Sequence, residues 1–183
     1  MKKILFFILF LGMATTGFSQ EEEKEKPSFK HYLGVHAGLT TGLGFSYRYW
    51  PGKLGFQLTG IPVFYSSENT STFFSSFGIS VLMNIKEFSK VSIFSYLGNH
   101  MIYNRDTYYD YYYDPITYET VKSDTKTVNE NINYNIALGV GLKVNFWEVM
   151  DFNLQAGYGV LTSLNNESFR SSFSGEAGLY YHF

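Results

Sequence analysis

The stretch that decides the fold is the end of the chain, FSGEAGLYYHF at residues 173–183. From Ala177 to Phe183 every second residue is apolar or aromatic, and the residues between them include Gly178, Tyr180 and His182. Side chains of a β-strand point alternately to its two faces. A strand with this pattern suits an apolar environment on one face and a polar interior on the other.

The same alternation recurs along the chain. It is clearest at Ile132–Val144, where a period of two over so many residues excludes a helix face. In a third segment, Gly60 and Pro62 separate apolar residues of opposite parity, which leaves its facing open and makes a β-bulge there a candidate. The pattern predicts eight strands, at about 31–39, 43–50, 54–65, 73–85, 91–103, 132–144, 152–162 and 173–183.

Composition agrees with a sheet whose two faces differ. The chain is 20% aromatic and 16% charged, and its mean hydropathy is only −0.11, because apolar and polar residues average out within any window. It has no cysteine, which excludes disulfides, thiolate metal sites and a lipid-anchored cysteine. A net charge of −2 is too weak a field to indicate nucleic-acid binding.

The start of the chain predicts export. Lys2 and Lys3 precede an apolar run at Ile4–Ala14, and Gly17 and Ser19 are small residues at a possible cleavage site, as in a signal peptide. The run is shorter than the roughly 20 apolar residues that span a bilayer, although a retained anchor is the alternative. We expect a signal peptide at 1–19 and a charged, disordered tail at 20–30, for which the alternative is a partner-docking arm.

The leader, the alternating strands and the GLYYHF ending resemble small eight-stranded outer-membrane β-barrels of the OmpA/OmpX-like superfamily, over residues 31–183. The resemblance implies an all-β fold: a closed eight-stranded antiparallel transmembrane β-barrel with an up-and-down meander. It also implies a bacterial outer-membrane location with both termini in the periplasm. The implied partners are outer-membrane lipids, lipopolysaccharide and the barrel assembly machinery, which would read the C-terminal signal formed by Leu179, Tyr181 and Phe183.

Connection lengths alternate as such barrels prefer, with short periplasmic turns and longer extracellular loops. With a periplasmic N-terminus, Thr40–Gly42 is a short cell-surface connection and residues 104–131 form a long extracellular loop. Aromatic residues near the predicted strand ends would form two girdles at the membrane boundaries.

The inward-facing set is where chemistry is possible. An eight-stranded barrel is just wide enough for its own side chains, and buried charges there must pair. We expect an interior polar network of Arg48, Lys143, Glu176 and His36, in which Glu176 pairs with Arg48 or Lys143. This network would act as a structural plug, or alternatively line a gated path.

The inward residues offer no recognisable catalytic or metal site. Ser174 and His182 share one strand, but at ~3.3 Å per residue they lie about 27 Å apart and cannot meet. His100 would have to come from another strand without a supporting motif. We therefore expect no enzymatic activity, no cofactor and no metal.

The predicted loop at 104–131 is rich in tyrosine and aspartate. Tyrosine offers a large amphipathic contact area at a small entropy cost, whereas the spacing of the carboxylates lacks the features of an EF-hand calcium loop. The alternative is that the fifth and sixth strands simply extend beyond the membrane as a Tyr-rich hairpin. The candidate contact residues are Tyr108, Tyr109, Tyr111, Tyr112, Tyr113 and Tyr118.

The sequence thus favours a structural or surface-interaction protein that acts on an unknown surface ligand through this loop. The second possibility is a narrow channel for small solutes or small hydrophobic molecules, and the third is a lipid A-modifying enzyme.

Overall fold

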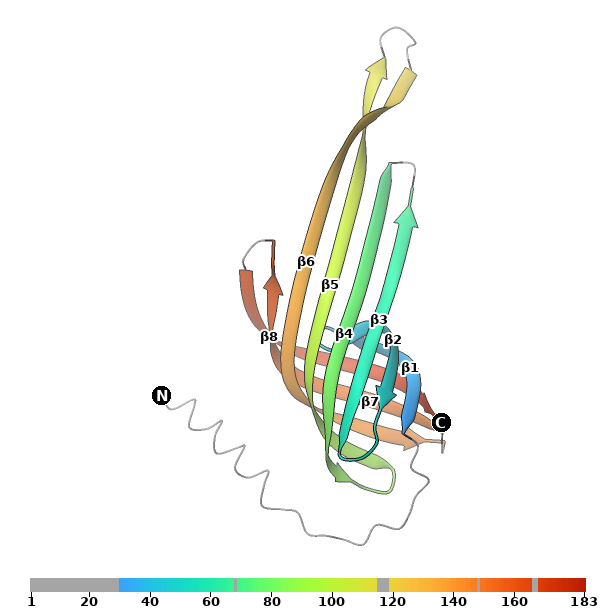
Figure 1. Cartoon of the computed structure of the whole chain (residues 1–183), viewed down its shortest axis with the longest axis vertical. Helices are drawn as coiled ribbons and strands as arrows, with labels where there is room; N and C mark the ends of the chain where they lie inside the picture. Colours follow the sequence, from blue (N-terminus) through green and yellow to red (C-terminus); the bar gives the residue numbers. More distant parts are fainter. Residues whose placement is uncertain (1–29, 68, 115–118, 148, 166–167) are drawn as a thin grey trace, which may run out of the picture.

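The computed structural model describes residues 30–67, 69–114, 119–147, 149–165 and 168–183. They form eight antiparallel strands, each hydrogen-bonded to its neighbours in the chain, and the first strand pairs with the last to close the barrel (Figure 1). The predicted fold class is therefore confirmed. The strands are β1 (His31–Gly38), β2 (Gly42–Tyr49), β3 (Leu54–Ser66), β4 (Thr70–Glu87), β5 (Val91–Asp114), β6 (Glu119–Phe146), β7 (Met150–Ser163) and β8 (Ser168–His182).

Strand faces follow the alternation of the sequence. On β6, Leu138, Val140 and Leu142 are exposed on the outer wall, whereas Ala137 and Lys143 are buried inside. Inward side chains such as Arg48, Gln57 and Asn153 are almost fully buried, as expected for eight strands. Near the rim that carries the chain ends, the apolar part of the interior is mainly aromatic and consists of Tyr32, Trp50, Phe94, Tyr96 and Tyr180 together with Leu82.

The two ends of the barrel meet at one rim. The backbone N–H of Phe183 donates to the carbonyl of His31 over 3.0 Å, and the N–H of Trp50 donates to that of Lys30 over 2.7 Å. The ring of Phe183 stacks on His31 and Tyr181. Leu179, Tyr181 and Phe183 are all exposed on the outer wall.

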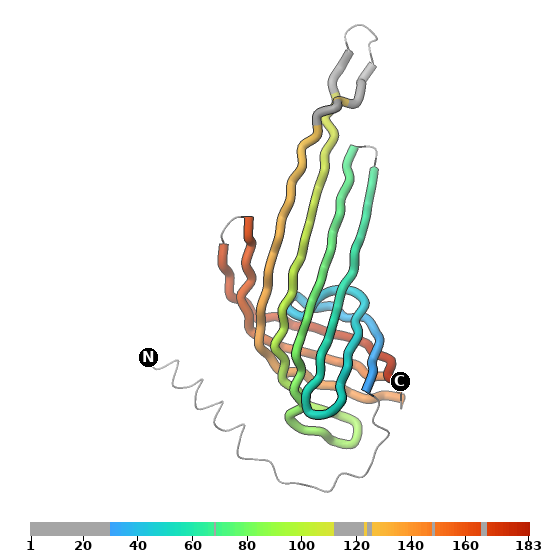
Figure 2. The backbone as a smooth tube through the Cα atoms, viewed as in Figure 1, coloured from blue at the N-terminus to red at the C-terminus, as the bar shows by residue number. Residues whose placement is uncertain are grey.

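The strands differ greatly in length. β1 and β2 have 8 residues each, whereas β5 has 24 and β6 has 28. The β3–β4 and β5–β6 hairpins consequently rise far beyond the other strands at the rim opposite the chain ends (Figures 1 and 2).

Residues 104–131 were predicted as a long loop, with an extended Tyr-rich hairpin as the alternative, and the described part of this segment forms the hairpin. Residues up to Asp114 belong to β5 and those from Glu119 onward to β6, with pairing from Asn104–Asn131 to Asp114–Glu119 and a register shift between Tyr109 and Tyr111. Tyrosine, threonine and valine favour pleated sheet, so this sequence continues the strands. Tyr118 lies outside the described residues.

The predicted bulge in β3 is wrong. β3 pairs with β4 without a break from Leu54–Met83 to Ser66–Ser71, and the shift on β4 lies instead between Asn84 and Lys86. Beyond Gly60, β3 extends past the end of β2, and side chains on both of its faces are accessible. The apolar residues there therefore need not all lie on one face. Pro62 lies where β2 no longer pairs with β3, an edge position at which its missing N–H is tolerated.

The predicted signal peptide and all of the charged tail except Lys30 lie outside the described residues. Within the described ranges, no helix is long and apolar enough to cross a membrane.

Candidate functional site

The connection between β1 and β2 folds into the barrel. Thr40 and Thr41 are fully buried, and the chain leaves this turn through Gly42 at a φ of 107°. The turn lies against β4 and β5 at two glycines, since a Cβ atom on Gly78 would collide with the Thr41 carbonyl and one on Gly98 with the Thr40 carbonyl. The turn therefore crosses the interior instead of standing on the surface, which corrects the prediction of a cell-surface connection.

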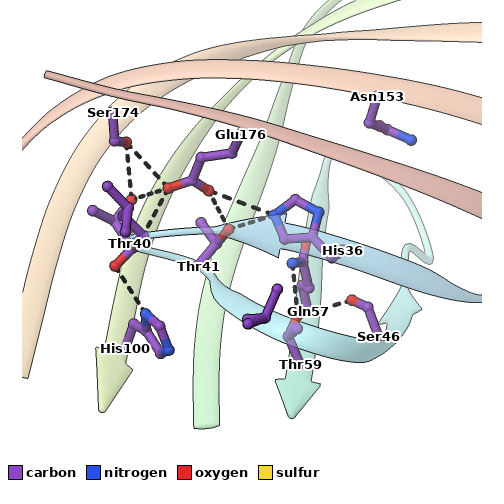
Figure 3. A network of polar contacts seen from close by, with 12 residues as sticks. His36, Thr40, Thr41, Ser46, Gln57, Thr59, His100, Asn153, Ser174 and Glu176 are labelled. Carbon is purple, nitrogen blue, oxygen red and sulfur yellow. Dashed lines mark hydrogen bonds and ion pairs between the residues drawn. The ribbon is translucent and has the colours of Figure 1, made fainter. Parts of the chain in front are cut away.

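Glu176 on β8 holds one side of this turn (Figure 3). Its carboxylate accepts the backbone N–H of Thr40 over 2.9 Å and the hydroxyl groups of both Thr40 and Thr41. Ser174 donates to the same carboxylate over 3.1 Å, and the Nε2 of His36 lies 3.5 Å from it. These contacts supply the hydrogen bonds that a buried carboxylate needs.

Residues of β4, β5 and β6 hold the other side of the turn. The carbonyl of Leu39 accepts from the amide of Asn135 over 2.7 Å and from the Nδ1 of His100 over 2.8 Å. The Nε2 of His100 lies 2.8 Å from the hydroxyl of Ser76, which in turn accepts the N–H of Leu43 over 3.0 Å. Backbone groups of a buried turn must find partners, and here strands from opposite walls provide them.

A second polar cluster lies nearer the rim of the chain ends. Arg48 donates from Nε to Gln57 and from Nη1 to Asn153, each over 2.7 Å, and its guanidinium carbon lies 3.9 Å from the centroid of the Tyr180 ring. The Nζ of Lys143 lies 5.1 Å from the centroid of the Trp50 ring. The faces of aromatic rings attract cations, so these rings stabilise both buried charges.

The four residues predicted to form one interior network are all buried. Hydrogen bonds that run from Arg48 through Gln57, Thr59, Ser46 and Tyr180 to His36 connect the two clusters. His36 and Glu176 lie together at the turn, whereas Arg48 and Lys143 lie in the second cluster. The predicted pairing of Glu176 with Arg48 is wrong, because the turn brings two hydroxyls and an N–H to that carboxylate. Sequence reasoning missed Thr40 and Thr41, whose one signal was that they join the two shortest strands through small, uncharged residues.

The geometry does not assemble a catalytic triad among the described interior residues. Ser174 and His36 both contact Glu176, whereas nucleophilic catalysis requires the histidine between the hydroxyl and the carboxylate. His182 lies 3.7 Å from Asp151 near the opposite rim, far from Ser174. His100 contacts Ser76, but the Leu39 carbonyl orients its ring instead of a carboxylate.

The tyrosines of the tall hairpins form a second candidate site. Tyr108 and Tyr111 are about two-fifths exposed. The hydroxyl of Tyr111 donates to the side chain of Asn69 over 2.7 Å, which ties the β5–β6 hairpin to the tip of β3–β4. The backbones of Tyr112 and Tyr113 pair with β6. These contacts connect the hairpins and leave tyrosine rings accessible.

No protein-family model matches the chain, and no curated protein matches its sequence. Its fold is similar to three solved structures. These are small eight-stranded outer-membrane β-barrels. The resemblance predicted from the sequence is to the same class of protein.

Each similar structure matches most of both chains at low identity. The N-terminal β-barrel domain of Pseudomonas aeruginosa OprF is 14% identical over 84% of this chain and 95% of its own, with a TM-score of 0.39. Neisserial surface protein A is 19% identical over 84% and 97%, with a TM-score of 0.42. Ail, the attachment invasion locus protein of Yersinia pestis, is 13% identical over 84% and 93%, with a TM-score of 0.44.

The contacts of Glu176 predict its contribution to stability. Glu176→Ala leaves the buried N–H of Thr40 without its acceptor, so we expect the free energy of unfolding to fall by about 2–3 kcal/mol. Urea unfolding in detergent micelles, followed by the fluorescence of buried Trp50, measures the change.

The matched control is Glu130→Ala, which removes a half-exposed carboxylate 3.4 Å from Arg105. Exposed pairs contribute about 1 kcal/mol or less. Equal losses for the two variants would contradict a dominant role for Glu176.

Proposed function

We propose that this chain is an integral outer-membrane barrel with a structural or surface-interaction role and without enzymatic activity. The outer wall carries this proposal: large apolar side chains are exposed on it around the barrel, for example Leu33 at 55%, Leu138 at 50% and Leu154 at 49%. A water-soluble barrel would turn such residues inward, whereas this interior holds Glu176, Arg48 and other polar groups. Extensive exposed apolar surface marks contact with a membrane.

In this proposal both termini lie in the periplasm and the tall hairpins lie outside the cell. Connections at the rim of the chain ends are short, and the long hairpins occupy the other rim, as barrels of this class prefer. Outer-membrane lipids and lipopolysaccharide would contact the wall. The barrel assembly machinery would read Leu179, Tyr181 and Phe183.

The proposed contact surface is the upper part of the β5–β6 hairpin, around Tyr108, Tyr109 and Tyr111. Its support is the combination of a rigid paired backbone with accessible tyrosine rings, which lose little entropy on binding. The ligand for this surface is a macromolecule that meets the cell from outside. The channel alternative is disfavoured because the β1–β2 turn crosses the interior.

The orientation is tested by labelling. The chain has no cysteine, so a single introduced thiol is the only labelled site. On intact cells, a membrane-impermeant maleimide should label Lys126→Cys on the tall hairpin. It should label Lys90→Cys, at the opposite rim, only after the outer membrane is permeabilised. The reverse pattern would overturn the orientation.

The plug is tested by conductance. In planar bilayers we expect the wild-type protein to show no discrete openings, since the turn fills the interior. Glu176→Ala should produce openings because it releases the turn, whereas Glu130→Ala should stay silent. Steady conduction by the wild type would favour the channel alternative instead.

The contact surface is tested by shortening the hairpin. Residues 108–127 are replaced by Asn-Gly, which joins the paired residues Thr107 and Val128 through a tight turn. Proximity labelling on intact cells should then lose surface partners that the wild type captures. Tyr111→Phe, which keeps the ring, should retain them. An unchanged partner set in the shortened variant would contradict the proposal.

A further inference from the structure

The outer wall carries an apolar groove at the strands next to the inward-folded turn. Across three neighbouring strands the register places Phe45 of β2, Gly60 of β3 and Phe77 of β4 in one row. Because Gly60 has no side chain, the row leaves a gap between the two phenylalanines. The groove has a volume of about 230 Å³, and its apolar lining is Leu33, Phe45, Tyr47, Leu58, Gly60 and Phe77.

We propose that this groove binds one acyl chain of an outer-membrane lipid. The inference rests on the proposed membrane location of the barrel. Phe45 is 70% exposed and Phe77 is 48% exposed, so both would present ring surface to the surrounding hydrocarbon. An unbranched chain seated over Gly60 would remove that surface from contact with mobile lipid and contact both rings along its length.

The shape of the barrel above the groove supports a lipid as the occupant. β2 pairs with β3 only as far as Gly60, and β1 pairs with β8 only as far as Ala177. Within the described residues, the upper parts of β3 and β8 therefore have no strand neighbour on these sides. Open strand edges are not found in lipid hydrocarbon, because their backbone groups would lack partners. Lipid headgroups or water must therefore reach down to the end of the β1–β2 hairpin.

The length of β1 indicates how far lipid headgroups or water must extend toward the membrane centre. At a tilt of about 40°, a strand rises about 2.5 Å per residue along the membrane normal. The 8 residues of β1 then cover about 20 Å, less than the apolar band of about 25 Å that such barrels present. A lipid beside this hairpin sits several ångströms lower than its neighbours. Its headgroup meets the open edges, and its chain lies along the groove.

Photolabelling tests the site directly. The protein is reconstituted in vesicles of phosphatidylethanolamine and phosphatidylglycerol that contain a trace of phospholipid with a diazirine in one acyl chain. After irradiation, mass spectrometry of peptides locates the label. We expect labelling of the groove residues of β2 and β3 to exceed that of residues 136–140 of β6, on another part of the outer wall, several-fold.

Three variants make the test specific. Gly60→Leu fills the groove and should abolish the enrichment. Gly175→Leu places the same side chain at an outward glycine of β8 where a Cβ meets nothing within 4 Å, and should leave the enrichment intact. Because a Cβ at Gly60 would lie 3.1 Å from the Ser76 carbonyl, Phe45→Ala serves as the second groove variant. It truncates a largely exposed ring and should also lower the enrichment.

The outcomes separate this inference from the proposed function. Even labelling of all outward strands, or enrichment that survives Gly60→Leu and Phe45→Ala, would overturn the lipid site while leaving the membrane barrel intact. No labelling of any outward strand would overturn the membrane location itself. A dimer in detergent that Phe45→Ala dissociates would replace the lipid with a second copy of the chain.

Discussion

The contact between Glu176 and the β1–β2 turn is the interaction on which the rest of the barrel depends. Glu176 belongs to the last strand and the turn joins the first two, so this contact fixes the seam at which the barrel closes. Tyr180, on the same face of β8, donates to Ser46 of β2 over 3.0 Å and contacts His36 of β1. A charge buried this deeply is costly unless fully hydrogen-bonded. The carboxylate therefore favours the one closed arrangement in which the turn reaches it.

The inward turn also explains why the strands are so unequal. A turn can enter the interior only if its strands stop short of the rim, and β1 and β2 are the shortest of the eight. Their early end leaves β3 and β8 without neighbours above Gly60 and Ala177. Pro62 has no N–H to leave unpaired on the β3 side, which lowers the cost of that open edge. The inward direction of Thr40 and Thr41 thus determines where β3 and β8, on the two sides of the β1–β2 hairpin, lose their strand neighbours.

Much of the fold is predictable, because alternation of apolar and polar residues shows which face of a strand each side chain lies on. The alternation at Ile132–Val144 and at the C-terminal strand is enough to place Leu138 outside and Glu176 inside, and both are found there. Alternation carries no information about where a strand stops pairing, so a loop after Tyr103 and a continuation of β5 through Asn104 were both left open. It also does not say whether a three-residue connection folds inward. Without that information, Glu176 was predicted to pair with Arg48 or Lys143, whereas the guanidinium of Arg48 is bound by Gln57 and Asn153.

The hydrogen bonds among buried side chains restrict where this chain can meet other molecules. Thr40 and Thr41 donate to Glu176, His100 contacts Ser76 and the Leu39 carbonyl, and Arg48 donates to Gln57 and Asn153. These contacts within the protein stabilise the closed barrel. The accessible surfaces are the hairpin tyrosines and the outer wall. These two surfaces suit different ligands, since the first presents hydroxyls on a rigid sheet and the second presents mainly apolar groups around Gly60. A ligand from outside the cell would meet the hairpins, whereas a lipid would meet the groove, and the two can be occupied at once.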